Sequence, residues 1–132
     1  QTDITVPLQY LTNAIKKRCT TFLLSDFIGE KDFKSPLTIA NRKHDVVAIQ
    51  VYDRRVADLP DVGLMKVRDA ETGEEMLVDT GSKKVRNMHA AWWRGQQNRL
   101  REIFTRSGVD NVSVRTDHDY VTALMGLFKQ RA

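Results

Sequence analysis

The chain has 132 residues, 41% of them hydrophobic and 29% charged, which is an ordinary composition for one globular domain. A chain of this length buries a hydrophobic core without disulfides or a structural metal, and its one cysteine, Cys19, has no partner within the chain. The formal charge of +4 is too small an excess to indicate nucleic-acid binding by itself. The sequence has no apolar run of membrane-spanning length and no signal-peptide core. We therefore expect a cytoplasmic protein, a location that an anchor elsewhere in a longer protein would change.

Helices and strands are predicted to alternate along the chain. Apolar spacing predicts helices over 2–18, 36–43, 83–107 and 120–130, and strands over 19–24, 45–52, 64–68, 75–78 and 109–115. The run 45–52 is continuous rather than alternating in its apolarity, which indicates a strand covered on both faces. Ser35 with Pro36 predicts the start of the second helix, and Ser82 and Gly108 predict the two ends of the long one.

This order of elements predicts an α/β fold. It is typical of right-handed crossovers and of a mostly parallel, doubly wound, Rossmann-like sheet with helices on both faces. The short strands 64–68 and 75–78, joined through the turn-forming segment 70–73, predict a β-hairpin insertion or an antiparallel sheet edge. Three main strands are few for such a sheet, so we expect that N-terminal strands are missing from this chain.

Polar residues follow the strands, where ligands gather in open α/β sheets. The first strand ends in Ser25 and Asp26, the second is followed by Asp53, and the third by Asp117 and Asp119. Carboxylates on one rim suit Mg²⁺, which prefers oxygen ligands. Aspartate also caps helices, which is the alternative interpretation for Asp117 and Asp119, and Asp53 can equally form a surface ion pair with the arginines after it. Asp26, with no helix directly after it, is the best candidate.

Six motifs occur in order along the chain: FLLSDF at 22–27, HDVVAIQVYD at 44–53, LPDVG at 59–63, DAETG at 69–73, VDT at 78–80 and RTDHDY at 115–120. Together they resemble the domain of unknown function fifty-eight family, a bacterial and archaeal family with a von Willebrand factor A-like domain. The resemblance spans nearly the whole chain. It implies that 1–132 is the C-terminal portion of a single von Willebrand factor A-like domain.

The resemblance also implies a metal site. A-type domains build a metal-ion-dependent adhesion site from an Asp-x-Ser-x-Ser loop, a threonine on a second loop and an aspartate on a third. Thr2 matches the threonine and Asp26 the third-loop aspartate, whereas the Asp-x-Ser-x-Ser loop is expected upstream of Gln1. We expect Mg²⁺ or Mn²⁺ in the intact protein and none in this fragment, because one hydroxyl and one carboxylate are too few ligands.

The function that the resemblance implies is binding rather than catalysis. It predicts a Mg²⁺-dependent protein–protein interaction module that acts with a MoxR-type AAA ATPase in the assembly or activation of other proteins. The residues themselves leave one alternative open, a Mg²⁺-dependent phosphohydrolase that uses Asp26 and Asp53. The sequence offers no convincing nucleophile or general base for that enzyme.

The long helix invites a competing interpretation, since it carries seven basic residues and one acid: Lys83, Lys84, Arg86, Arg94, Arg99, Arg101, Arg106 and Glu102. With Trp92 and Trp93 nearby, this surface is compatible with nucleic-acid binding. We favour solvated bases, with Trp93 partly covered and an apolar face directed at the sheet by Val85, Met88, Trp92, Ile103 and Phe104. No nucleic-acid partner is therefore expected, and an acidic protein surface is the alternative partner.

Two further expectations concern the histidines and the sheet edge. His44, His89 and His118 lie far apart in the sequence and are predicted to be surface or capping residues. Without upstream strands, the strand 19–24 has an unpaired edge, which predicts self-association through that edge or through the apolar face of the first helix.

Overall fold

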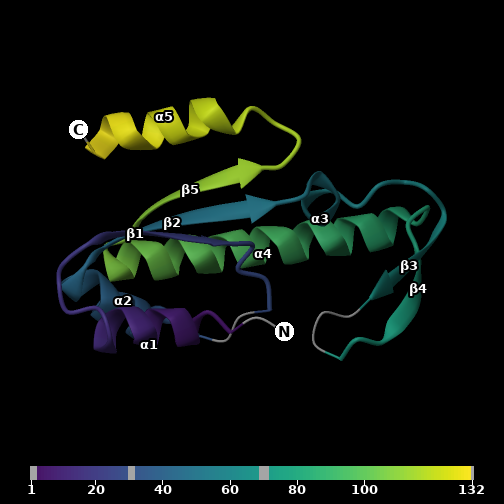
Figure 1. Ribbon diagram of the computed structural model, residues 1–132. Helices are drawn as coiled ribbons and strands as arrows, with labels where there is room; N and C mark the ends of the chain where they lie inside the picture. Colours follow the sequence, from purple (N-terminus) through teal and green to yellow (C-terminus); the bar gives the residue numbers. More distant parts are fainter. Residues whose placement is uncertain (1–2, 30–31, 69–71, 132) are drawn as a thin grey trace.

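The computed structural model describes residues 3–29, 32–68 and 72–131 and has an α/β architecture (Figure 1). Its helices are α1 (Thr5–Asn13), α2 (Lys34–Lys43), α3 (Arg54–Ala57), α4 (Lys83–Ser107) and α5 (Tyr120–Arg131). Its strands are β1 (Thr20–Ser25), β2 (Asp45–Tyr52), β3 (Leu64–Arg68), β4 (Glu75–Asp79) and β5 (Asp110–Arg115). The predicted parallel sheet is confirmed, with the strand order β1-β2-β5, and β3 and β4 form a separate antiparallel hairpin.

The sheet lies between two helical layers. Figure 1 shows α5 on one face and α4, with α1 and α2, on the other. The central strand β2 is buried from Val46 to Gln50, as its continuous apolarity predicted. The main core joins the sheet to α1, α2 and α4 through Ile4, Leu8, Leu11, Phe27, Phe33, Leu37, Ala40, Val46, Ala48, Leu100, Ile103, Phe104 and Val109. Each large side chain buried there contributes about 1.5–3 kcal/mol.

The ends of α4 were predicted correctly, whereas those of α1 and α2 were not. The Ser82 hydroxyl accepts the Val85 N–H at 3.4 Å, and Gly108 ends α4 in the left-handed conformation at φ +69°. The helix α1 ends at Asn13, before the exposed basic residues 16–18, which offer the core no apolar side chain.

The start of α2 differs from the prediction because a different residue satisfies its first N–H groups. The helix begins at Lys34, whose N–H is accepted by the Asp32 carboxylate at 3.0 Å. Ser35 and Pro36 therefore lie inside the first turn, where proline is tolerated because its missing N–H has no intrahelical partner there. None of the described helices has the length and apolar character needed to cross a membrane.

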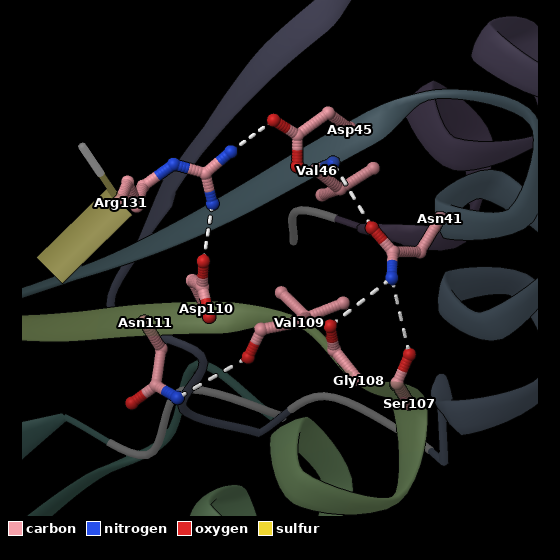
Figure 2. Close-up of polar contacts among 9 residues, drawn as sticks. All are labelled: Asn41, Asp45, Val46, Ser107, Gly108, Val109, Asp110, Asn111 and Arg131. Atoms are coloured by element: carbon pink, nitrogen blue, oxygen red, sulfur yellow. Dashed lines mark hydrogen bonds and ion pairs between the residues drawn. The ribbon is translucent and has the colours of Figure 1, made fainter. Parts of the chain in front are cut away.

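Asn41 joins α2, the end of α4 and the start of β2 (Figure 2). Its side-chain oxygen accepts the Val46 N–H at 3.1 Å, and its amide nitrogen lies 3.2 Å from the carbonyl oxygens of both Ser107 and Gly108. One side chain thereby satisfies backbone groups that come from two distant segments of the chain.

Arg131 ties the end of α5 to the same edge of the sheet. Its guanidinium group pairs with Asp45 at the start of β2 and with Asp110 at the start of β5 (Figure 2). These contacts lie at the amino ends of the strands, so they stabilise the layer of α5 without occupying the opposite rim, where polar side chains were predicted to gather.

His44 corrects the prediction that all three histidines are surface or capping residues, because its side chain is 0% exposed. The Cys19 N–H lies 3.0 Å from Nδ1, and since a backbone N–H only donates, Nδ1 accepts. Nε2 therefore carries the proton of the neutral ring and donates to the Leu11 carbonyl at 2.9 Å. His44 thus joins the C-terminal half of α1 to the chain entering β1, a structural role that its place beside a helix end did not indicate.

Candidate functional site

The loop after β1 places one carboxylate at the carboxyl end of the sheet. The Ser25 hydroxyl accepts the Phe27 N–H at 3.0 Å, and Asp26 Oδ1 accepts the Ile28 N–H at 2.9 Å. Phe27 has φ +56°, a conformation that is strained for a side chain of this size. Its fully buried ring packs 5.4 Å from the ring of Phe104, which offsets the strain. The loop therefore buries Phe27 and leaves Asp26 exposed beside it.

Gln50 links the ends of all three parallel strands, although the sequence analysis did not single it out. It is 3% exposed, its Nε2 donates to the Asp26 carbonyl at 3.4 Å, and its Oε1 accepts the Ser113 hydroxyl at 2.8 Å. The signal was a polar residue inside the continuous run 45–52. A buried amide in such a run needs partners from the neighbouring strands, and here they steady the backbone that carries Asp26.

The other candidate aspartates have structural partners. Asp53 caps α3, since its Oδ1 accepts the Arg55 N–H at 2.7 Å. Asp119 accepts the Val121 N–H at 3.0 Å at the start of α5, so the capping interpretation is confirmed for it. For Asp117 that interpretation is wrong, because its carboxylate receives two hydrogen bonds from the Arg115 guanidinium, at 2.7 and 3.1 Å. The hydrogen bond from Arg115 lowers the pKa of Asp117, and the positive charge of Arg115 lowers it further against desolvation.

The predicted metal ligands are only partly described. Thr2 lies outside the described residues, so the pairing of Thr2 with Asp26 stays a prediction. Over 3–29, 32–68 and 72–131, no group of three or more His, Cys, Asp or Glu side chains is placed to hold a metal ion. Asp26 by itself offers one carboxylate, too few ligands to hold Mg²⁺. The described residues therefore do not fit a complete metal site.

A groove of about 700 Å³ lies beside Asp26 and is walled by the β3–β4 hairpin, α3 and α4. Its apolar lining includes Val56, Met65, Val67, Val78, Val85 and Trp92. Asp26, Arg55, Arg68 and His89 add polar groups to the lining. His89 Nε2 donates to the Val56 carbonyl at 2.6 Å, so it holds α3 against α4 and fixes one wall.

Thr80 fixes the hairpin wall. Its buried hydroxyl donates to the Gly63 carbonyl at 2.5 Å and accepts the Val62 N–H at 3.0 Å, which closes the base of the hairpin. Arg86 on α4 donates to the Thr80 carbonyl at 2.7 Å and pairs with Asp61 at 3.3 Å. The hairpin is thereby attached to the helix that forms the opposite wall. Sequence reasoning missed this role because the contacts join three separate segments.

The predicted inner face of α4 is correct only in its C-terminal half. Ile103 and Phe104 are buried, but Met88 is 64% exposed, and Trp92 is exposed along the groove. Trp93 faces the sheet instead, with its ring centroid 5.1 Å from that of Tyr52. The N-terminal half of α4 runs beside α3 and the hairpin (Figure 1), so groove and hairpin, rather than the sheet, surround its apolar side chains.

The fold and the site define an α/β protein with polar groups at the carboxyl end of a parallel sheet and an apolar groove beside them. Residues 1–99 match the family model "Protein of unknown function DUF58", and the chain belongs to this family. It is similar to an uncharacterised protein of Mycobacterium avium, at 28% identity over 131 residues, 98% of this chain and 76% of that protein.

Two further relatives are longer. Uncharacterised proteins of Mycobacterium bovis and Mycobacterium tuberculosis are 30% identical over 131 residues, and the chain spans 40% of the length of each. No solved structure matches the chain significantly. The predicted family is therefore confirmed, whereas the von Willebrand factor A-like class and the assignment of 1–132 to part of one such domain stay predictions.

Proposed function

We propose that this chain is a protein-interaction module that binds a segment of a partner protein in the groove beside Asp26. The observation that carries the proposal is the groove itself, about 700 Å³ in volume with a largely apolar lining. Concave apolar surfaces with a few placed polar groups are typical binding sites. Exposed apolar side chains on the elements around the groove add to the surface available to a partner: Val62, Leu64, Leu77, Met88 and Trp92.

The charges around the groove favour a partner segment that combines apolar and acidic side chains. Arg55 and Arg68 are exposed in the lining, against the single carboxylate of Asp26. The basic side chains of α4 extend the positive field along the same wall. Complementary charge speeds association and selects partners more than it adds affinity, so apolar contacts to residues such as Trp92 would supply most of the binding energy.

The proposal extends to Mg²⁺ and to a class of partner in the longer protein. Asp26 would supply one carboxylate oxygen to an ion completed by ligands outside the described residues, and such an ion attracts an acidic side chain of the partner. The support is the exposed carboxylate at the end of β1 and its match to the third-loop aspartate of adhesion sites. The family resemblance supports a MoxR-type AAA ATPase as the partner.

Titration calorimetry of the chain, and of a version extended upstream, against a purified MoxR-type AAA ATPase with and without Mg²⁺ tests this function. Trp92→Ala is expected to weaken binding about tenfold or more, as truncation of a central interface residue does. Asp26→Ala is expected to remove the Mg²⁺ dependence of the extended version. Ile39→Ala, an equally exposed apolar residue on α2, is the matched control and should bind like wild type. Unchanged binding by Trp92→Ala would overturn the groove as the binding surface.

The phosphohydrolase alternative gains no support from the described contacts. The Asp53 carboxylate accepts a backbone N–H at the start of α3, which is a sufficient structural reason for its presence. Metal-dependent hydrolysis of para-nitrophenyl phosphate that disappears in Asp26→Ala would reinstate it.

A further inference from the structure

The outer edge of β1 is open and lacks the usual protection of edge strands. Of the described strands, only β2 pairs with β1. The Asp45 N–H bonds to the Cys19 carbonyl at 2.9 Å, and backbone groups facing one neighbour alternate along a strand. Thr21, Leu23 and Ser25 therefore face β2, which leaves the open edge to Thr20, Phe22 and Leu24. Charges, prolines and bulges normally discourage pairing at an edge, and β1 contains no charged residue, proline or glycine.

The same residues border an exposed apolar surface. Phe22 and the 62% exposed Leu24 lie on the face of the sheet that α5 covers only in part. Phe22 contacts Phe128 of α5 edge to face, with ring centroids 6.0 Å apart. Val121 and Met125 continue the exposed stripe of α5 from Phe128. We name the β1 edge patch as Phe22, Leu24, Val121, Met125 and Phe128. Because the patch is uncharged, it does not repel a copy of itself.

We propose that β1 pairs antiparallel with β1 of a second copy of this chain, so that two three-stranded sheets form one continuous sheet across a two-fold axis. A two-fold contact requires a surface that is complementary to itself. The open edge of β1 meets this requirement because it supplies both N–H donors and C=O acceptors. An axis perpendicular to the sheet places both α5 helices on the same face, where they cover the Phe22 and Leu24 side chains of both copies.

The charges at the two ends of β1 select the register. With Phe22 opposite Phe22 of the second copy, residues equally far from position 22 face each other in an antiparallel pair. Arg18 lies four residues before Phe22 and Asp26 lies four residues after it, and both are exposed. Arg18 of each copy therefore lies opposite Asp26 of the other. Lys16 and Lys17 add positive charge at the same end, so the antiparallel arrangement joins basic to acidic ends twice.

Sedimentation velocity of the full chain at micromolar concentration tests the pairing. The expected species is a dimer of twice the 15.1 kDa chain mass. Phe22→Lys places two like charges at the axis and should give a folded monomer, as checked by circular dichroism. Leu64→Lys, at an exposed apolar site on the hairpin, is the matched control and should remain dimeric. A wild-type monomer, or a Phe22→Lys variant that stays dimeric, would overturn the proposal.

Charge reversal tests the register independently. Arg18→Asp and Asp26→Arg each juxtapose like charges and should weaken the dimer about tenfold. The double variant restores opposite charges and should recover the wild-type dissociation constant. Failure of the double variant to recover would overturn this register, and open-ended aggregates in place of a dimer would overturn the two-fold arrangement. Because the groove is not involved, Trp92→Ala should leave dimerisation unchanged, which separates this proposal from the proposed function.

Discussion

Phe27 stacks on Phe33 with ring centroids 5.6 Å apart and an interplanar angle of 23°. The two residues flank the connection from β1 to α2, and both side chains are fully buried. Their contact fixes the loop that carries Asp26, because Phe27 adopts the left-handed conformation only where burial of its ring compensates for the strain. The position of the candidate carboxylate thus depends on aromatic packing beneath it.

Phe27→Ala is expected to lower the free energy of unfolding by about 3–5 kcal/mol, because the variant loses a buried aromatic ring and keeps an unfavourable φ. Urea denaturation followed by circular dichroism measures the change. Tyr10→Ala removes an exposed aromatic ring and should change stability by less than about 0.5 kcal/mol. Equal effects of the two substitutions would contradict the role of Phe27 as the anchor of the loop.

Asn41→Ala is expected to cost about 1–3 kcal/mol, since it leaves the Val46 N–H and two carbonyl groups at the end of α4 without their side-chain partner. Thermal and urea unfolding of the variant measure this cost. Asn111→Ala is a suitable control because its only printed contact is one long hydrogen bond, 3.4 Å, to Val109 two residues away. A stability loss no larger than that of the control would show that water replaces the Asn41 contacts.

The parallel sheet and the ends of the long helix could be predicted because their signals are local. The apolar run 45–52 indicates a strand covered on both faces, and Ser82 and Gly108 act on backbone groups within a few residues. Asp119 was likewise recognisable as a cap, because its partner is two residues away.

The remaining features depend on contacts between distant segments. Gln50 and Thr80 acquire their roles from strands and loops that sequence spacing does not place. The burial of His44 depends on where α1 ends, and the predicted end was wrong. The two tryptophans of α4 exchanged their predicted orientations because the N-terminal half of this helix packs beside α3 and the hairpin instead of the sheet. Of the candidate site, the sequence identified Asp26 but not the groove beside it.

His44→Leu is expected to destabilise the fold by about 2–4 kcal/mol, because the Cys19 N–H and the Leu11 carbonyl lose their buried partner together. Urea denaturation measures the loss, and His118→Leu, at an exposed position, should leave stability nearly unchanged. A long-range ¹H–¹⁵N correlation spectrum of the wild type should show the proton on Nε2 of His44. The opposite tautomer would contradict the hydrogen bonds to Leu11 and Cys19.

The pair of Arg115 and Asp117 predicts a pH response at acidic pH. Arg115 lowers the pKa of Asp117 below its ordinary value of 3.8, first through the hydrogen bond and then through its positive charge. A group whose pKa is lower in the folded state contributes stability above its ordinary pKa, and that contribution is lost as the pH falls through the folded-state value. The gain is small because Asp117 is exposed. A carboxyl ¹³C titration should show the pKa of Asp117 rising in Arg115→Gln. Arg94→Gln, on the exposed side of α4, should leave it unchanged, and an equal response in both variants would show that overall charge, rather than the specific pair, sets the pKa.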